Sequence, residues 1–201
     1  MIKKIHLVSV LAVVVFLGIG ATWVITKATE ASKVLPAVIK QTPPFSLVSH
    51  HGEPFTNDSL RNKISVLDFI FTSCPGPCPI MSNNMRMLYN QYKLHPDLQF
   101  ISITVDPEYD SQEVLKIYAD ANGVNDRRWK FLRADMEKVK ILSSDGFLLM
   151  SDNLPAGHSV KFVLIDGDGN IRQYYNGTDK ASISILRSHI NLFLKKLRSS
   201  V

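Results

Sequence analysis

The sequence predicts an α/β protein in which a mixed sheet is flanked by helices, with one transmembrane helix near the N-terminus. Two observations predict this class. After residue 45, apolar and β-branched runs of strand length alternate with segments of helical periodicity. Before it, residues 7–26 contain no charged side chain, and about 20 such residues match the roughly 30 Å thickness of a bilayer core. A chain of 201 residues is long enough for one domain and a short extension.

The uncharged stretch reads LVSVLAVVVFLGIGATWVIT and follows Lys3 and Lys4. Positive charge before a membrane helix favours a cytoplasmic N-terminus and an exported C-terminal part. The stretch is longer than the roughly 7–15 apolar residues of a signal peptide, and Ala28-Thr29-Glu30 is a poor cleavage site, so we favour an uncleaved anchor over a cleaved signal. We expect a single-pass inner-membrane protein whose domain lies on the periplasmic or equivalent exported side.

The chain divides into three predicted parts. Residues 1–27 form the membrane anchor, residues 28–44 form a mixed, polar tether that ends at Pro43-Pro44, and residues 45–201 form the folded domain. The net charge of +5 includes three lysines that flank the apolar stretch, and the remainder contains no basic cluster. A nucleic-acid surface needs such a cluster, so we expect no nucleic-acid partner.

The elements of the domain follow from local patterns. Residues 45–55 predict a hairpin with His50-His51-Gly52 at its turn. Residues 64–71 and 98–105 are apolar runs typical of strands that are buried on both faces. Further strands are predicted at 129–132, 158–165 and 171–175, and helices at 78–92, 111–121, 135–143 and 182–197.

Cys74 and Cys78 are the two cysteines of the chain, and they stand between the first central strand and the helix that follows it. This is the arrangement of the thioredoxin fold. A disulfide between them would close a very small loop and would constrain the unfolded chain little, so the pair indicates chemistry. A helix N-terminus stabilises anions, and we therefore expect lowered thiol pKa values. Thiolates serve both as metal ligands and as redox nucleophiles, and the position alone leaves both roles open.

Two thiolates are soft ligands that favour Cu(I), zinc or iron–sulfur iron. Iron–sulfur clusters normally need four cysteines, and a closed structural zinc site needs four ligands. His158 stands in a loop just before a buried strand, and in a thioredoxin-like fold that loop passes beside the cysteine turn. We predict His158 as the third ligand, because a neutral imidazole with two thiolates completes a trigonal Cu(I) site.

Four segments together resemble the Sco/SenC family. In chain order they are Thr72–Pro79, Asp106–Asp110, Trp129–Leu132, and His158-Ser159 with the strand and turn that follow. The resemblance runs from about residue 43 to residue 198 and includes the N-terminal anchor. It implies a thioredoxin-like fold and copper, as Cu(I) or Cu(II), held by Cys74, Cys78 and His158.

The resemblance also implies a function: delivery of one copper ion to the binuclear copper centre of cytochrome c oxidase during assembly. The expected partners are the oxidase subunit that carries this centre and an upstream copper donor or thiol reductant. We assign no catalytic residue, because delivery is stoichiometric. The alternative is a membrane-anchored thiol–disulfide oxidoreductase that acts on oxidase-subunit cysteines and uses Cys74 and Cys78 without His158.

Other residues with possible roles have simpler interpretations. Asp106 and Asp110 precede a predicted helix and fit turn formation and capping, with a role in supporting the copper site or a partner as the alternative. Met81 and Met85 stand at helical spacing, which favours packing in the core over copper ligation.

Overall fold

The structure is a computed structural model that describes residues 14–23, 26, 33–149, 154–155 and 157–199. It contains two compact units, Met1–Leu35 and Pro36–Val201. In the first unit, residues 14–23 are helical. Among the described residues, no helix combines the length and the apolar character needed to cross a membrane. Most of the anchor predicted over residues 1–27, and the first part of the tether, lie outside the described residues.

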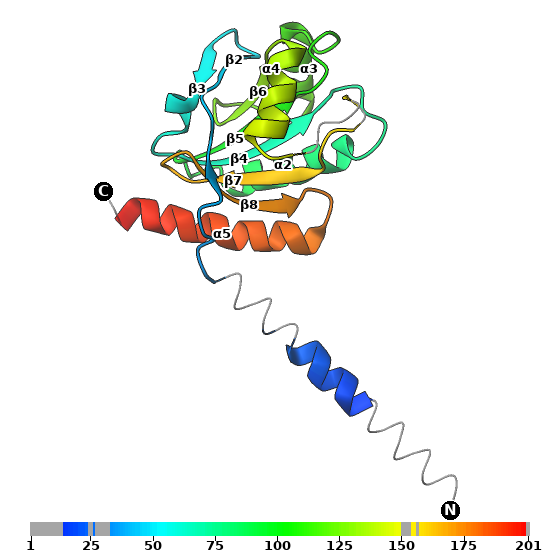
Figure 1. Ribbon diagram of the computed structural model, residues 1–201, viewed down its shortest axis with the longest axis vertical. Coiled ribbons are helices and arrows are strands. Elements are labelled where there is room, and N and C mark those ends of the chain that lie inside the picture. The colour runs from blue at the N-terminus through cyan, green and yellow to red at the C-terminus, as the bar shows by residue number, and fades with distance from the viewer. Residues whose placement is uncertain (1–13, 24–25, 27–32, 150–153, 156, 200–201) are drawn as a thin grey trace, which may run out of the picture. The chain divides into compact units, whose positions relative to one another are not determined.

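The second unit contains one sheet with helices packed against it (Figure 1). Its strands are β1 (Lys40–Gln41), β2 (Ser46–Ser49), β3 (Pro54–Thr56), β4 (Ile64–Ile70), β5 (Leu98–Thr104), β6 (Trp129–Arg133), β7 (Lys161–Ile165) and β8 (Asn170–Asn176). Its helices are α2 (Cys78–Gln91), α3 (Gln112–Ala121), α4 (Met136–Ile141) and α5 (Lys180–Ser199), with short helical turns at Asn57–Leu60 and Leu142–Gly146.

The strand order is β1-β8-β7-β4-β5-β6-β2-β3. Strands β4, β5 and β6 are parallel, whereas β7 is antiparallel to β4 and β8 is antiparallel to β7. Every residue of β4 and β5 is buried, as their largely apolar and β-branched sequences predicted. The prediction of a mixed sheet is therefore confirmed.

Helices cover both faces of this sheet. On one face, α2 is joined to α3 by a hydrogen bond between Ser82 and Tyr118, and to α5 by one from Tyr92 to Asn191. On the opposite face, Phe69 of β4 packs against Phe147, which follows the short helical turn after α4. A central strand that leads through a cysteine-containing turn into α2 is the thioredoxin-like arrangement that the sequence predicts.

Most element boundaries differ from the sequence prediction by one or two residues, and two segments differ more. Strand β7 begins at Lys161 and not at His158, because the main-chain N–H of His158 donates to the carbonyl of Pro155 in a local turn. Strand β1, within the segment assigned to the tether, pairs with β8 through Lys40 and Ile171.

Side chains cap the starts of α3 and α4, close to the first residues predicted for these helices. The Ser111 hydroxyl accepts a hydrogen bond from the N–H of Val114 at the start of α3, and the Asp135 carboxylate accepts one from the N–H of Lys138 at the start of α4. Local signals of this kind identify where a helix starts because they satisfy N–H groups that have no partner within the helix.

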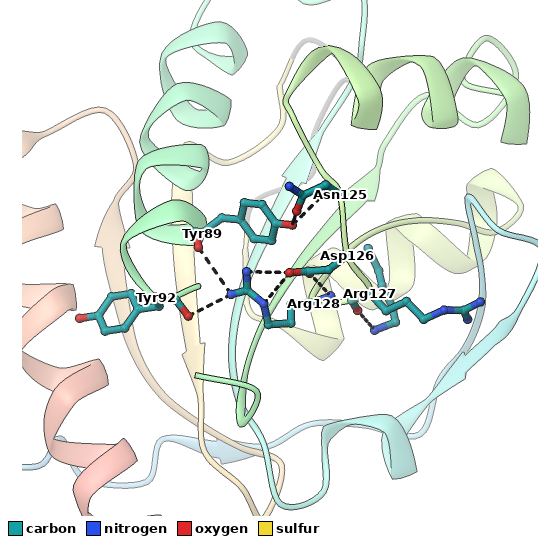
Figure 2. A network of polar contacts seen from close by, with 7 residues as sticks. Tyr89, Tyr92, Asn125, Asp126, Arg127 and Arg128 are labelled. Carbon is teal, nitrogen blue, oxygen red and sulfur yellow. Dashed lines mark hydrogen bonds and ion pairs between the residues drawn. The ribbon is translucent and has the colours of Figure 1, made fainter. Parts of the chain in front are cut away.

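Arg128 connects the C-terminal end of α2 to the start of β6 (Figure 2). Its guanidinium donates to the carbonyl of Tyr92 at 3.1 Å, pairs with Asp126 at 2.8 Å, and lies 4.5 Å from the ring centroid of Tyr89. The side chain is 13% exposed. A cation at this position also interacts favourably with the C-terminal end of the helix dipole.

We expect Arg128→Gln to lower the free energy of unfolding by about 1–3 kcal/mol, because a mostly buried, charge-assisted hydrogen-bond group is lost. The matched control is Arg127→Gln. The neighbouring Arg127 side chain is 69% exposed and pairs with Glu53 at the surface, so its loss should leave the urea midpoint nearly unchanged. Urea denaturation of both variants tests this, and equal losses would contradict the assigned role of Arg128.

Candidate metal centre

The loop between β4 and α2 places the two cysteines at different depths. Cys74 lies in a turn that is closed by a hydrogen bond from its own N–H to the carbonyl of Phe71 at 3.3 Å. Cys78 is the first residue of α2, and Pro77 and Pro79 flank it. Prolines suit this place because their fixed φ matches the first helical turn, where an N–H has no partner within the helix. Cys78 is 1% exposed, and Cys74 is half-buried.

His158 approaches these cysteines from the segment before β7. Its Nε2 lies 3.2 Å from Sγ of Cys78, across 80 positions of sequence. Its ring meets the ring of Phe71 edge-on, with centroids 5.3 Å apart. One ligand atom from each of Cys74, Cys78 and His158 lies within 4.8 Å of the other two. The structure thus brings together the three residues that the sequence selected, and their role as ligands stays a prediction.

The three donors lie within 4.8 Å of one another, which is close to the spacing that a single ion requires. Zinc–thiolate and zinc–imidazole bonds of roughly 2.0–2.3 Å give the scale for a metal of similar size, so donors up to about 4.5 Å apart can share one ion. Two sulfurs and one imidazole nitrogen form a soft donor set that suits Cu(I). The ion would replace the hydrogen that Nε2 of His158 and Sγ of Cys78 now share.

Burial shifts the pKa values of the two buried donors, His158 and Cys78. It lowers the pKa of His158, partly offset by contacts with the main chain of Ser159 and Phe69, so the ring is neutral near pH 7 and can offer a lone pair. Burial also raises the pKa of the Cys78 thiol. The prediction of a lowered thiol pKa at this helix N-terminus is therefore wrong for Cys78, because desolvation outweighs the helix dipole. A metal must displace this proton when it binds.

Cys74 is the outer donor of the three. It is free, as is Cys78, and its sulfur accepts a hydrogen bond from the N–H of Gly76 at 3.4 Å. The inner sulfur and the imidazole are held in the protein interior, so another molecule can reach the site first through Cys74.

Asp110 does not cap α3, because Ser111 has that role. Its carboxylate is fully buried and accepts hydrogen bonds from Thr72, in the cysteine loop, and from Thr104. The prediction of capping is wrong for Asp110, and the alternative of support for the copper site has a structural basis. Met81 and Met85 are fully buried in the core, as their spacing predicted.

Asp68 is a buried acidic residue that the sequence analysis did not select. It lies in the middle of β4 with no exposed surface, and it pairs in register with Ser102 of β5. Neither carboxyl oxygen makes a hydrogen bond of normal geometry to another described residue. Burial raises the pKa of Asp68 to about 7, against a smaller lowering by the Ser102 hydroxyl. The signal in the sequence was an acidic residue within a mostly apolar strand, ISVLDFI.

Comparison with known proteins identifies the family. A sequence profile described as SCO1/SenC matches residues 36–191. A SCO2-like protein of Rickettsia prowazekii is 38% identical over 112 residues, which cover 51% of this chain and 54% of that protein, so the chain spans about half of that relative. A protein of Stutzerimonas stutzeri that is named for copper binding is 30% identical over 151 residues, covering 71% of this chain and 72% of the relative.

A solved structure agrees with the profile. The SCO1/SenC family lipoprotein from Bacillus anthracis superimposes with a TM-score of 0.71 at 27% identity, over 83% of this chain and 98% of that one. The profile covers more than half of the chain and includes the cysteine loop, His158 and the whole central sheet. The chain belongs to the SCO1/SenC family.

Proposed function

We propose that the protein binds one copper ion through Cys74, Cys78 and His158 and delivers it to the binuclear copper centre of cytochrome c oxidase during assembly. The observation that carries this proposal is the convergence of two sulfurs and one imidazole nitrogen within 4.8 Å. The name of the Stutzerimonas stutzeri relative, which refers to copper binding, supports the metal. The description of Sco proteins as a family of cytochrome c oxidase assembly proteins supports the destination.

The donors differ in a way that suits delivery. Cys78 and His158 hold the ion from inside, and Cys74 holds it from the half-buried side. An incoming thiolate or imidazole of the acceptor would bind the copper while Cys74 leaves it, so the ion need not pass through water. Copper is cargo in this scheme, and the chain is unchanged after each transfer.

The proposed location is a membrane surface on the exported side. The uncharged stretch at residues 7–26 and the lysines before it support a single-pass anchor in the inner membrane. Such an anchor would keep the copper site near a membrane-bound oxidase subunit. An upstream copper donor or thiol reductant would act on the same exported side, because both cysteines lie there.

Copper analysis of the full chain in detergent tests the proposed function. We expect one copper ion per chain in the reduced protein, and loss of this copper in the Cys74→Ser/Cys78→Ser double variant. The double variant shows whether copper binds elsewhere on the chain. A wild-type protein that retains no copper after dialysis, while its thiols titrate as reduced, would contradict the proposal.

A second candidate is a thiol–disulfide oxidoreductase that acts on oxidase-subunit cysteines. It is favoured by one observation: two free thiols share a loop, with one sulfur half-buried and the other fully buried. The half-buried sulfur could attack a substrate disulfide, and the buried one could resolve the mixed disulfide. This activity needs both cysteines but not His158. Exchange with a dithiol substrate in the absence of copper measures it.

A further inference from the structure

We propose that Asp110 is a positioning residue that holds Cys74 in place for copper binding, by fixing Thr72 at the start of the cysteine loop. This inference deepens the proposed function and rests on it. Asp110 lies in the segment between β5 and α3 and is distant from the cysteines in sequence. Its carboxylate would act on the loop through Thr72 without touching the ion.

The carboxylate of Asp110 accepts three hydrogen bonds, all from neutral groups. Its Oδ2 accepts from the N–H of Thr72 at 3.2 Å and from the hydroxyl of Thr104 at 2.5 Å. Its Oδ1 accepts from the hydroxyl of Thr72 at 2.5 Å. The residue has no exposed surface. A buried carboxylate is tolerated only when such donors surround it, so this arrangement fixes the two threonines relative to each other.

Asp110 is itself attached to the rigid centre of the sheet. Thr104 ends β5, and its partner in register is Ile70, the last residue of β4. The Thr104 hydroxyl also accepts from the N–H of Asp106, and the N–H of Asp110 donates to the carbonyl of Asp106 at 2.8 Å. The segment 106–110 is therefore folded onto the ends of the two central strands, and its carboxylate points at the loop.

The cysteine loop needs an outside anchor. Pro75, Pro77 and Pro79 have no N–H group, so the loop can donate few hydrogen bonds to the rest of the protein. Thr72 lies two residues before Cys74, and the turn from Phe71 to Cys74 connects them. Both hydrogen-bond donors of Thr72, its N–H and its hydroxyl, donate to Asp110. A shift of Thr72 would therefore move Cys74 relative to Cys78 and His158.

The test replaces Asp110 by asparagine in the detergent-solubilised full chain. The amide keeps the shape but presents an NH₂ group where one acceptor oxygen stood, so at least one donor of Thr72 or Thr104 loses its partner. We expect copper affinity to fall about 10- to 100-fold, the usual effect of losing a group that orients a metal ligand. The Cu(II)–thiolate absorption band should also shift, because it reports the geometry of the sulfur ligands.

A metal-free measurement accompanies the copper titration. The rate at which iodoacetamide alkylates Cys74 in the reduced, metal-free chain, measured on the peptide by mass spectrometry, should rise several-fold in Asp110→Asn. The matched control is Asp106→Asn in the same loop, since Asp106 joins this cluster through its main-chain atoms. It should keep the wild-type rate, spectrum and affinity.

A pair of threonine variants keeps the inference testable if Asp110→Asn does not fold. Thr72→Val removes the hydroxyl and should behave as Asp110→Asn does, whereas Thr72→Ser retains it and should behave as wild type. Equal alkylation rates in Thr72→Val and Thr72→Ser, or in Asp110→Asn and Asp106→Asn, would overturn the positioning role. Absence of copper binding in the wild type would overturn the proposed function instead, and the alkylation rates would still decide on Asp110.

Discussion

Replacing His158 with alanine is expected to weaken copper binding by about 100-fold or more. The loss of a group that merely orients a ligand costs 10- to 100-fold in affinity, and the loss of a ligand itself should cost at least the upper end of that range. His158 supplies the single nitrogen donor of the three residues brought together here. Alanine also leaves space beside Cys78 that water can enter. Titration against a copper-specific chelator measures the change.

The control for this variant is His51→Ala. His51 is exposed on the turn between β2 and β3, so its removal should leave copper affinity at the wild-type value. Thiol exchange with a dithiol substrate should survive in His158→Ala, because both sulfurs remain. Unchanged copper affinity in His158→Ala would refute the three-ligand mechanism and would favour the oxidoreductase.

The substitution Asp68→Asn is expected to stabilise the protein at pH 8 by up to about 4 kcal/mol. Burial raises the pKa of Asp68 from 3.8 to about 7. The folded state therefore binds this proton more tightly than the unfolded state does. The resulting stability is fully present below about pH 4 and is lost as pH rises to about 7. Above that pH the folded protein contains a buried, ionised carboxylate, and asparagine removes that charge.

Urea denaturation between pH 4 and pH 8 tests this prediction. The difference in stability between Asp68→Asn and wild type should grow across this range and level off above about pH 7. Taking the difference matters because other groups titrate in the same range: burial lowers the pKa of His50 to about 4. Asp58→Asn is the control, since Asp58 is exposed beside Arg61. If the free energy of unfolding depends on pH in the same way for Asp68→Asn and wild type, ionisation of the buried carboxyl does not destabilise the folded state.

The sequence predicted the parts of the fold in which local and long-range requirements agree. The runs at β4 and β5 are rich in apolar and β-branched residues, and a strand buried on both faces is the structure that accommodates them. Ser111 and Asp135 marked helix starts through interactions within three residues. The loop around Cys74 and Cys78 was recognisable because its residue types and spacing are unusual.

The parts that the sequence did not predict depend on contacts between distant segments. The hydrogen bonds of Asp110 to Thr72 span 38 positions, and no local pattern distinguishes this carboxylate from a helix cap. The raised pKa of Cys78 reflects the depth of burial, which the helix-terminus rule does not include. Strand β7 starts late because a turn at Pro155 occupies the N–H of His158.

The short distance between His158 and Cys78 links copper binding to the stability of the folded protein. The contact of 3.2 Å between Sγ of Cys78 and Nε2 of His158 joins the beginning of α2 to the segment before β7, 80 positions away. A copper ion in the same place would be a cross-link between these segments, and any ligand that binds only the folded state stabilises it by mass action. A filled carrier should therefore resist proteases and heat better than an emptied one.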